Sequence, residues 1–156
     1  MKVEMSDNAG VIAFPPALYA GTLFIGLLLS FVFPISFLPR SLALILGVLV
    51  MICAGSILIS AFRVMNRAST AVNPSQPTTA IVSDGVFRLS RNPIYVSLTL
   101  LYIGITLLFN ALWALLLLLP LLGIVQIGVI QREEIYLERK FGDEYLRYKA
   151  RVRCWV

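Results

Sequence analysis

The feature that most constrains this chain is a set of four apolar runs that contain no charged residue. They cover residues 14–33, 41–62, 94–109 and 111–130. About 20 apolar residues suffice to cross the hydrocarbon part of a bilayer as a helix. The composition agrees, because 59% of the residues are hydrophobic and only 13% are charged, whereas soluble domains have about 25% charged residues. The sequence therefore predicts an all-α, polytopic membrane protein with four transmembrane helices.

The 156 residues leave room for one folded unit. We expect a single membrane-embedded domain over residues 1–156, with a long loop at 63–93 and a C-terminal segment at 131–156. The third and fourth runs are separated only by Asn110, so they are predicted to form a tight hairpin. Pro120 is expected to kink the fourth helix.

Basic residues are distributed unevenly between the two ends of the predicted helices. With four spans, Arg40 alone falls on one side, and the other 12 of the 13 Lys and Arg residues, including Lys2 and Arg67, fall on the opposite side. Loops rich in Lys and Arg stay on the cytoplasmic side of a membrane. Both termini, the long loop and the C-terminal segment are therefore predicted to be cytoplasmic; if the protein is bacterial, the membrane is the inner or plasma membrane.

The chain has two cysteines and no histidine. Cys53 lies inside the second run and Cys154 lies near the end of the sequence, so we predict neither a disulfide nor a metal site. Without histidine, acid–base chemistry would fall to Glu, Asp, Tyr, Lys or water. No nucleic-acid partner is expected.

Two polar clusters border the third and fourth runs. The first covers residues 84–95 and includes Arg88, Arg91 and an Asn-Pro turn, and the second covers residues 132–148. Gly142 is predicted to end one helix of the second cluster, and Asp143 to cap another. Because both clusters fall on the same side of the predicted bundle, we expect them to form one site.

The adjacent carboxylates Glu133 and Glu134 need a cationic partner. Charged groups at the end of a transmembrane helix cost free energy unless they are hydrated or paired. The partner is either a structural cation, namely Arg88, Arg91 or Arg132, or the amino group of a bound ligand. The residues by themselves leave both interpretations open.

The order of these motifs resembles the integral-membrane isoprenylcysteine carboxyl methyltransferases and phospholipid methyltransferases. The likeness covers about half of the chain and rests on GVFRLSRNPIY at 85–95 and EEIYLERKFGDEYLRY at 133–148, which flank a two-span hairpin. The sequence departs from the isoprenylcysteine enzymes at Asn92, where they usually have His, and at Ser97, where Gly is common.

The resemblance implies methyl transfer from S-adenosylmethionine to a lipophilic acceptor, such as an isoprenylcysteine-like carboxylate or a phospholipid headgroup, that enters from the bilayer. It implies a cofactor site made of Arg91, Asn92, Pro93, Tyr95, Glu133, Glu134, Tyr145 and Tyr148. Arg91 and Glu134 are also the candidate catalytic residues. The chemistry agrees, since the donor's ammonium needs a carboxylate, its carboxylate needs a guanidinium, and its adenine needs apolar or aromatic walls.

Two other classes of function are compatible with parts of the sequence. An NADPH-dependent membrane reductase of the sterol-reductase type would use Arg88 and Arg91 for its pyrophosphate, although Glu133 and Glu134 oppose this. The other class is a non-enzymatic four-helix membrane protein. Transport is disfavoured, because transporters place ionisable groups near the bilayer midplane and here all charges lie at the ends of the runs.

Overall fold

The computed structural model describes residues 9–73 and 76–156, and these residues form helices and loops without a β-strand. The predicted all-α fold is thereby confirmed, while the predictions that involve Lys2 lie outside the described residues. The helices are α1 (Pro15–Val32), α2 (Arg40–Arg67), α3 (Pro93–Phe109), α4 (Leu112–Val125), α5 (Gln131–Phe141) and α6 (Asp143–Arg151). A 3-10 turn, η1 (Gly85–Arg88), precedes α3, and a π-helical turn, η2 (Gln126–Ile130), joins α4 to α5.

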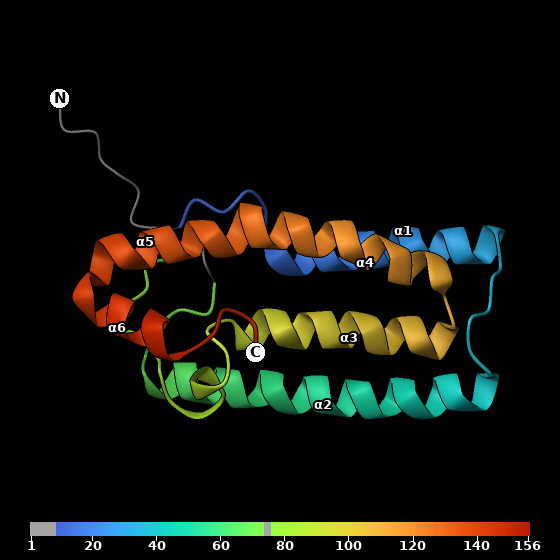
Figure 1. Ribbon diagram of the computed structural model, residues 1–156, viewed down its shortest axis with the longest axis horizontal. Coiled ribbons are helices and arrows are strands. Elements are labelled where there is room, and N and C mark those ends of the chain that lie inside the picture. Colours follow the sequence, from blue (N-terminus) through green and yellow to red (C-terminus); the bar gives the residue numbers. More distant parts are fainter. Residues whose placement is uncertain (1–8, 74–75) are drawn as a thin grey trace.

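The four long helices form two antiparallel pairs that lie side by side (Figure 1). Helix α1 packs against α4, and α2 packs against α3. The start of α3 and the end of α2 lie at the same end of the molecule as α5, α6 and the long loop (Figure 1). The chain reversals thus gather its polar segments at one end of the bundle.

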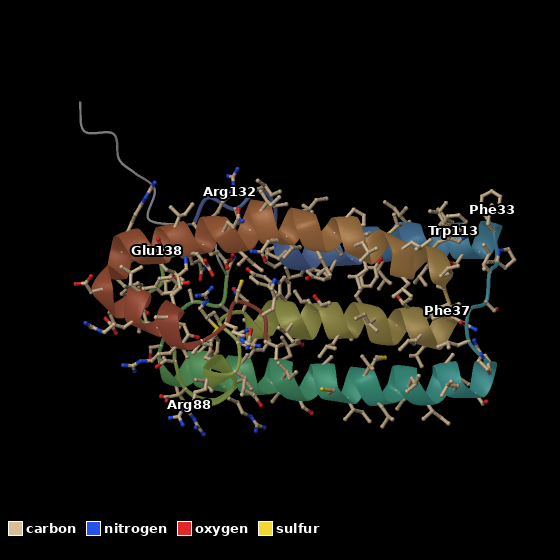
Figure 2. All side chains as sticks on the ribbon, in the orientation of Figure 1. Phe33, Phe37, Arg88, Trp113, Arg132 and Glu138 are labelled. Atoms are coloured by element: carbon tan, nitrogen blue, oxygen red, sulfur yellow. The ribbon has the colours of Figure 1, made fainter. Side chains whose placement is uncertain are left out.

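The two ends of the bundle differ in their side chains. Figure 2 shows Arg88, Arg132 and Glu138 at the end that carries α5 and α6, and Phe33 and Trp113 at the opposite end. There the Trp113 indole donates a hydrogen bond of 2.9 Å to the Phe33 carbonyl. Aromatic rings with a polar atom are typical of a membrane–water interface.

Within the described residues, three helices are long and apolar enough to cross a membrane. They are α1, α2 and the continuous helix Leu112–Phe141, which contains α4, η2 and α5. Helix α3 is also apolar and has 17 residues, a length of about 26 Å at 1.5 Å per residue. Three to four helices are therefore suited to spanning a bilayer.

Several predicted boundaries differ from the structure. Helix α2 continues past Phe62 to Arg67, because no glycine or proline interrupts this stretch, and the predicted loop 63–93 is therefore shorter. The hairpin prediction is correct, since Asn110 adopts a left-handed conformation with φ 51° between α3 and α4. The α-helix continues through Pro120, and its departure from α geometry comes later, at η2.

The predicted break after α5 is correct in its position but not in its details. Gly142 ends α5 with φ 52°, a conformation that glycine adopts without strain. Asp143 was predicted to cap the next helix, but it is the first residue of α6, and Gly142 occupies the capping position. One residue therefore serves both helices, which explains the sharp turn between them.

Small residues let the paired helices approach closely. A Cβ atom at Gly104 would lie 2.5 Å from Met51 Cγ and 3.2 Å from the Gly47 carbonyl, so α3 and α2 meet there almost backbone to backbone. The Ser97 hydroxyl donates a 2.8 Å hydrogen bond to the Ala54 carbonyl across the same interface. Packing of small residues and interhelical hydrogen bonds associate helices in lipid, so these contacts fix how α3 is placed.

Candidate functional site

The start of α3 determines where the first polar cluster lies. Pro93 is the first helical residue, a position at which proline's fixed φ and missing N–H are favourable. Asn92 precedes it but does not cap the helix, because its side-chain amide donates to the Cys154 carbonyl at 3.0 Å. The Arg91 backbone N–H donates to the Arg153 carbonyl at 2.9 Å. The loop before α3 is therefore bound to the segment after α6.

Arg91 and Glu134 form a buried ion pair between the two polar clusters. Arg91 Nη2 lies 2.7 Å from Glu134 Oε1, and the two side chains are only 9% and 14% exposed. Arg91 Nη1 also donates to the Lys149 carbonyl at 3.1 Å. Arg91 Nε is buried and has no hydrogen-bond partner within the described residues. One guanidinium thus links the loop before α3 to α5 and α6.

The neighbouring carboxylate, Glu133, has a different partner. The hydroxyl of Tyr95, the third residue of α3, donates to Glu133 Oε1 at 2.6 Å. In the described part of the chain Glu133 forms no salt bridge. Consecutive residues on a helix point about 100° apart, so one of the two carboxylates meets a hydroxyl and the other a guanidinium.

Helix α6 contributes aromatic side chains and a lysine. The rings of Tyr145 and Tyr148 pack edge to face with their centroids 6.1 Å apart, and the Tyr148 hydroxyl donates to the Phe87 carbonyl at 2.8 Å. Lys149 Nζ lies 3.0 Å from Glu134 Oε2 and 2.5 Å from Glu138 Oε1. These contacts hold α6 against α5 and against η1.

The pKa values of three α6 side chains are raised, so these side chains keep their protons. Burial raises the pKa of Tyr148 to about 12, although the Arg91 guanidinium acts in the opposite direction. Burial likewise raises the pKa of Tyr145. Hydrogen bonds to Glu138 and Glu134 raise the pKa of Lys149. At neutral pH the two phenols remain hydrogen-bond donors and Lys149 remains a cation, so none of the three is a general base.

A cavity of about 480 Å³ opens between these segments, a size typical of small-molecule and cofactor sites. Most of its wall is apolar. The charged side chains in the wall are those of Arg91, Glu133 and Glu134. All eight residues predicted for the cofactor site line this one cavity: Arg91, Asn92, Pro93, Tyr95, Glu133, Glu134, Tyr145 and Tyr148. The two polar clusters therefore line one cavity.

The structure also decides which structural cation pairs with the acidic residues. Of the three candidates, Arg91 binds Glu134. Arg88 is exposed and pairs with Asp84, and Arg132 donates to the Gly10 carbonyl at 2.9 Å. An ion pair is therefore present, but it engages only one of the two glutamates.

Several residues of the site were not predicted from the sequence. Lys149, which pairs with Glu134 but is not part of the cavity wall, is one of them, although its spacing of four residues from Tyr145 places it on the same face of a helix. The cavity wall also includes apolar side chains from α2 and from the segment before α1, among them Leu58, Phe62, Met65 and Phe14. No local signal marks these four, because apolar residues in a membrane helix look alike wherever they face.

Comparison with known proteins gives a family and one short, close match. The family model described as phospholipid methyltransferase matches residues 42–144. An uncharacterized protein from Haemophilus influenzae is 70% identical over 27 residues, which are 17% of this chain and 43% of that protein. The chain thus covers less than half of the length of that relative. No solved structure matches.

Proposed function

The chain belongs to the phospholipid methyltransferase family, whose model spans about two thirds of it, and on this premise we propose that it transfers a methyl group from S-adenosylmethionine to a lipophilic acceptor. The family does not favour the reductase or the non-enzymatic alternative. The observation that carries the proposal is the single cavity in which Glu133, Glu134 and Arg91 lie among apolar and aromatic side chains. These are the groups that an amino-acid ligand with an adenosyl part requires.

The two glutamates are proposed to have different roles. Arg91 and Lys149 bind both oxygens of Glu134, so this carboxylate is already neutralised by the protein. Glu133 contacts a neutral hydroxyl and is therefore the better site for the ammonium group of the donor. Arg91, which lines the same cavity, would hold the donor's carboxylate, and Glu134 would orient Arg91.

The remaining residues of the cavity are proposed to position and enclose the bound S-adenosylmethionine. Tyr145 and Tyr148 offer aromatic faces for the adenosyl part, and Asn92 and Pro93 fix the backbone beside Arg91. When bound, S-adenosylmethionine supplies a methyl group on a sulfonium, and the bond from methyl to sulfur breaks as the bond to the acceptor forms. Positioning of two reactants supplies about 7–11 kcal/mol of such a barrier, so the absence of histidine is no obstacle.

Whether the methyl transfer needs a general base depends on the acceptor. A carboxylate acceptor carries a lone pair and needs no proton removal, whereas an amine or a thiol must lose a proton. Glu133 and Glu134 are the carboxylates in the cavity wall that are available to accept it, whereas the Tyr95 hydroxyl donates its proton to Glu133. Both an isoprenylcysteine-like carboxylate and a phospholipid headgroup are thus compatible with the residues present. We also propose four spans, with the cavity at the cytoplasmic end and the acceptor arriving from the bilayer.

The proposal is tested by calorimetry of the detergent-solubilised protein with S-adenosylmethionine and, separately, with NADPH. We expect the wild type to bind S-adenosylmethionine only. Glu133→Gln should weaken binding at least tenfold, which corresponds to about 1.4 kcal/mol, with an unchanged melting temperature. Glu134→Gln should lower both the affinity and the melting temperature, because it also breaks the buried ion pair.

The matched control is Glu144→Gln, the same chemical change at an exposed position on α6. It should leave both the affinity and the melting temperature as in the wild type. A wild type that binds NADPH and not S-adenosylmethionine would contradict the methyltransferase proposal. Equal affinity in Glu133→Gln and the wild type would contradict the role of Glu133 alone.

A further inference from the structure

The π-helical turn η2 is an irregularity that the proposed chemistry does not explain. In it the Gln131 N–H bonds to the Gln126 carbonyl, five residues back instead of four. Such turns hold one residue more than a turn of α-helix, are rare, and occur frequently at functional sites. Here the turn lies directly before α5, the helix that carries Glu133 and Glu134.

The extra residue determines which side chains face the cavity. After η2, each residue takes the angular position that the preceding residue would have in an unbroken α-helix, a change of about 100°. Without the π turn, the position opposite Tyr95 would hold Arg132 in place of Glu133. The π turn therefore presents carboxylates to the cavity and leaves Arg132 to bind the Gly10 carbonyl.

The segment before α1 is docked on this turn. The Ile12 N–H donates to the Gly128 carbonyl at 3.2 Å, so a backbone acceptor of the π turn bonds outside its own helix. The same segment contributes Ala9 and Phe14 to the cavity wall. The contact thus connects one wall of the cavity to the turn that orients the two carboxylates.

The close approach of Ile12 requires glycine at position 128. Gly128 is buried, and a Cβ atom placed there would overlap the Ile12 side chain, with Ile12 Cγ1 at 2.7 Å. The overlapping atoms, Cδ1 and Cγ1, belong to a side chain that is 52% exposed, so any rotation that relieves the overlap takes the Ile12 side chain off the turn. A methyl group at position 128 would therefore turn the Ile12 side chain away from the turn, displace the segment or rotate the turn.

From this geometry we infer that Gly128 is a positioning residue for the cavity: by admitting Ile12 it holds the segment 9–14 and the π turn in the arrangement that directs Glu133 and Glu134 inward. The inference rests on the proposed function for its ligand, S-adenosylmethionine. Gly128 contributes no side chain to that ligand, and it acts through Ile12 and α5.

The test compares three variants with the wild type by calorimetry with S-adenosylmethionine. Gly128→Ala should weaken binding at least fivefold. The double variant Ile12→Ala/Gly128→Ala removes the overlapping side chain and should restore the affinity to within about twofold of the wild type. Gly123→Ala is the matched control, because it makes the same change at an exposed glycine of the same helix whose Cβ would contact nothing. It should bind as the wild type does.

A second measurement needs no ligand. Hydrogen–deuterium exchange of the peptide that contains Ile12 should be slow in the wild type, faster in Gly128→Ala, and slow again in the double variant. Wild-type affinity in Gly128→Ala, or a loss that the double variant does not restore, would overturn the inference. A wild type that does not bind S-adenosylmethionine would overturn the proposed function. In that case the exchange experiment still tests Gly128, because unchanged exchange of the Ile12 peptide in Gly128→Ala would contradict its positioning role.

Discussion

Arg91 and Lys149 both contact the Glu134 carboxylate, but they differ in exposure. The Arg91 side chain is 9% exposed and the Lys149 side chain 36% exposed. A buried ion pair has already lost its hydration, so removing one partner leaves an uncompensated charge. A half-exposed partner such as Lys149 is replaced by water at a lower cost. The same carboxylate therefore has one essential counter-ion and one supporting counter-ion.

This difference predicts the stability of two variants. Arg91→Met should lower the free energy of unfolding by about 3–5 kcal/mol. Lys149→Met should lower it by less than about 1 kcal/mol. Both changes replace a long cationic side chain by a long apolar one, so each serves as the control for the other. Thermal melting in one detergent measures both, and an equal loss in the two variants would contradict the assignment of Glu134 to Arg91.

The residues of the candidate site could largely be predicted from the sequence, but the different partners of Glu133 and Glu134 could not. The charges and the motif order predicted that Arg91, Glu133 and Glu134 share one cavity. They left open which glutamate meets a cation, because that choice depends on the rotation of α5. The sequence of residues 126–130 gives no sign of an extra residue in the turn, since a π turn is stabilised by tertiary contacts such as that of Ile12 with Gly128.

The packing of α3 against α2 determines where one wall of the cavity lies. Helix α3 begins with the residues of the site, and its position depends on the contact of Gly104 with Met51 and Gly47. The apolar runs predicted both helices to within a few residues, because length and hydrophobicity are local properties. They did not identify Gly104, since its importance depends on which residue of α2 lies opposite.

We therefore predict that Gly104→Ala destabilises the protein. Its Cβ would lie 2.5 Å from Met51 Cγ and 3.2 Å from the Gly47 carbonyl, and overpacking of this kind costs about 1–3 kcal/mol. Gly55→Ala on α2 is the control, because a Cβ there would contact nothing. Melting temperatures should fall for Gly104→Ala and remain the same or rise for Gly55→Ala, since alanine favours a helix over glycine. A Gly104→Ala variant as stable as the wild type would show that α2 and α3 separate easily.

The cavity exists because segments far apart in the sequence return to one end of the bundle. The motif order predicted this meeting of the polar clusters, as an even number of spans returns the chain to its starting side. The apolar walls from Phe14 and from the α2 residues Leu58, Phe62 and Met65 could not be predicted in the same way. They depend on how the two helix pairs are placed side by side, and no charge or turn residue encodes that placement.

Helix α2 allows the orientation of the bundle in the membrane to be tested. Helix α2 has 28 residues and is therefore about 42 Å long, longer than the roughly 30 Å hydrocarbon core. Arg40 and Arg67 are its first and last residues, so they must lie on opposite sides if α2 spans the bilayer. The distribution of basic residues predicts that Arg67 is cytoplasmic.

In a background with Cys53→Ser and Cys154→Ser, a membrane-impermeant maleimide applied from outside should label Arg40→Cys in intact cells. It should label Arg67→Cys only after the membrane has been permeabilised. Labelling of both variants in intact cells would contradict a spanning α2, and the reverse pattern would place the cavity on the side of the membrane that cytoplasmic S-adenosylmethionine does not reach.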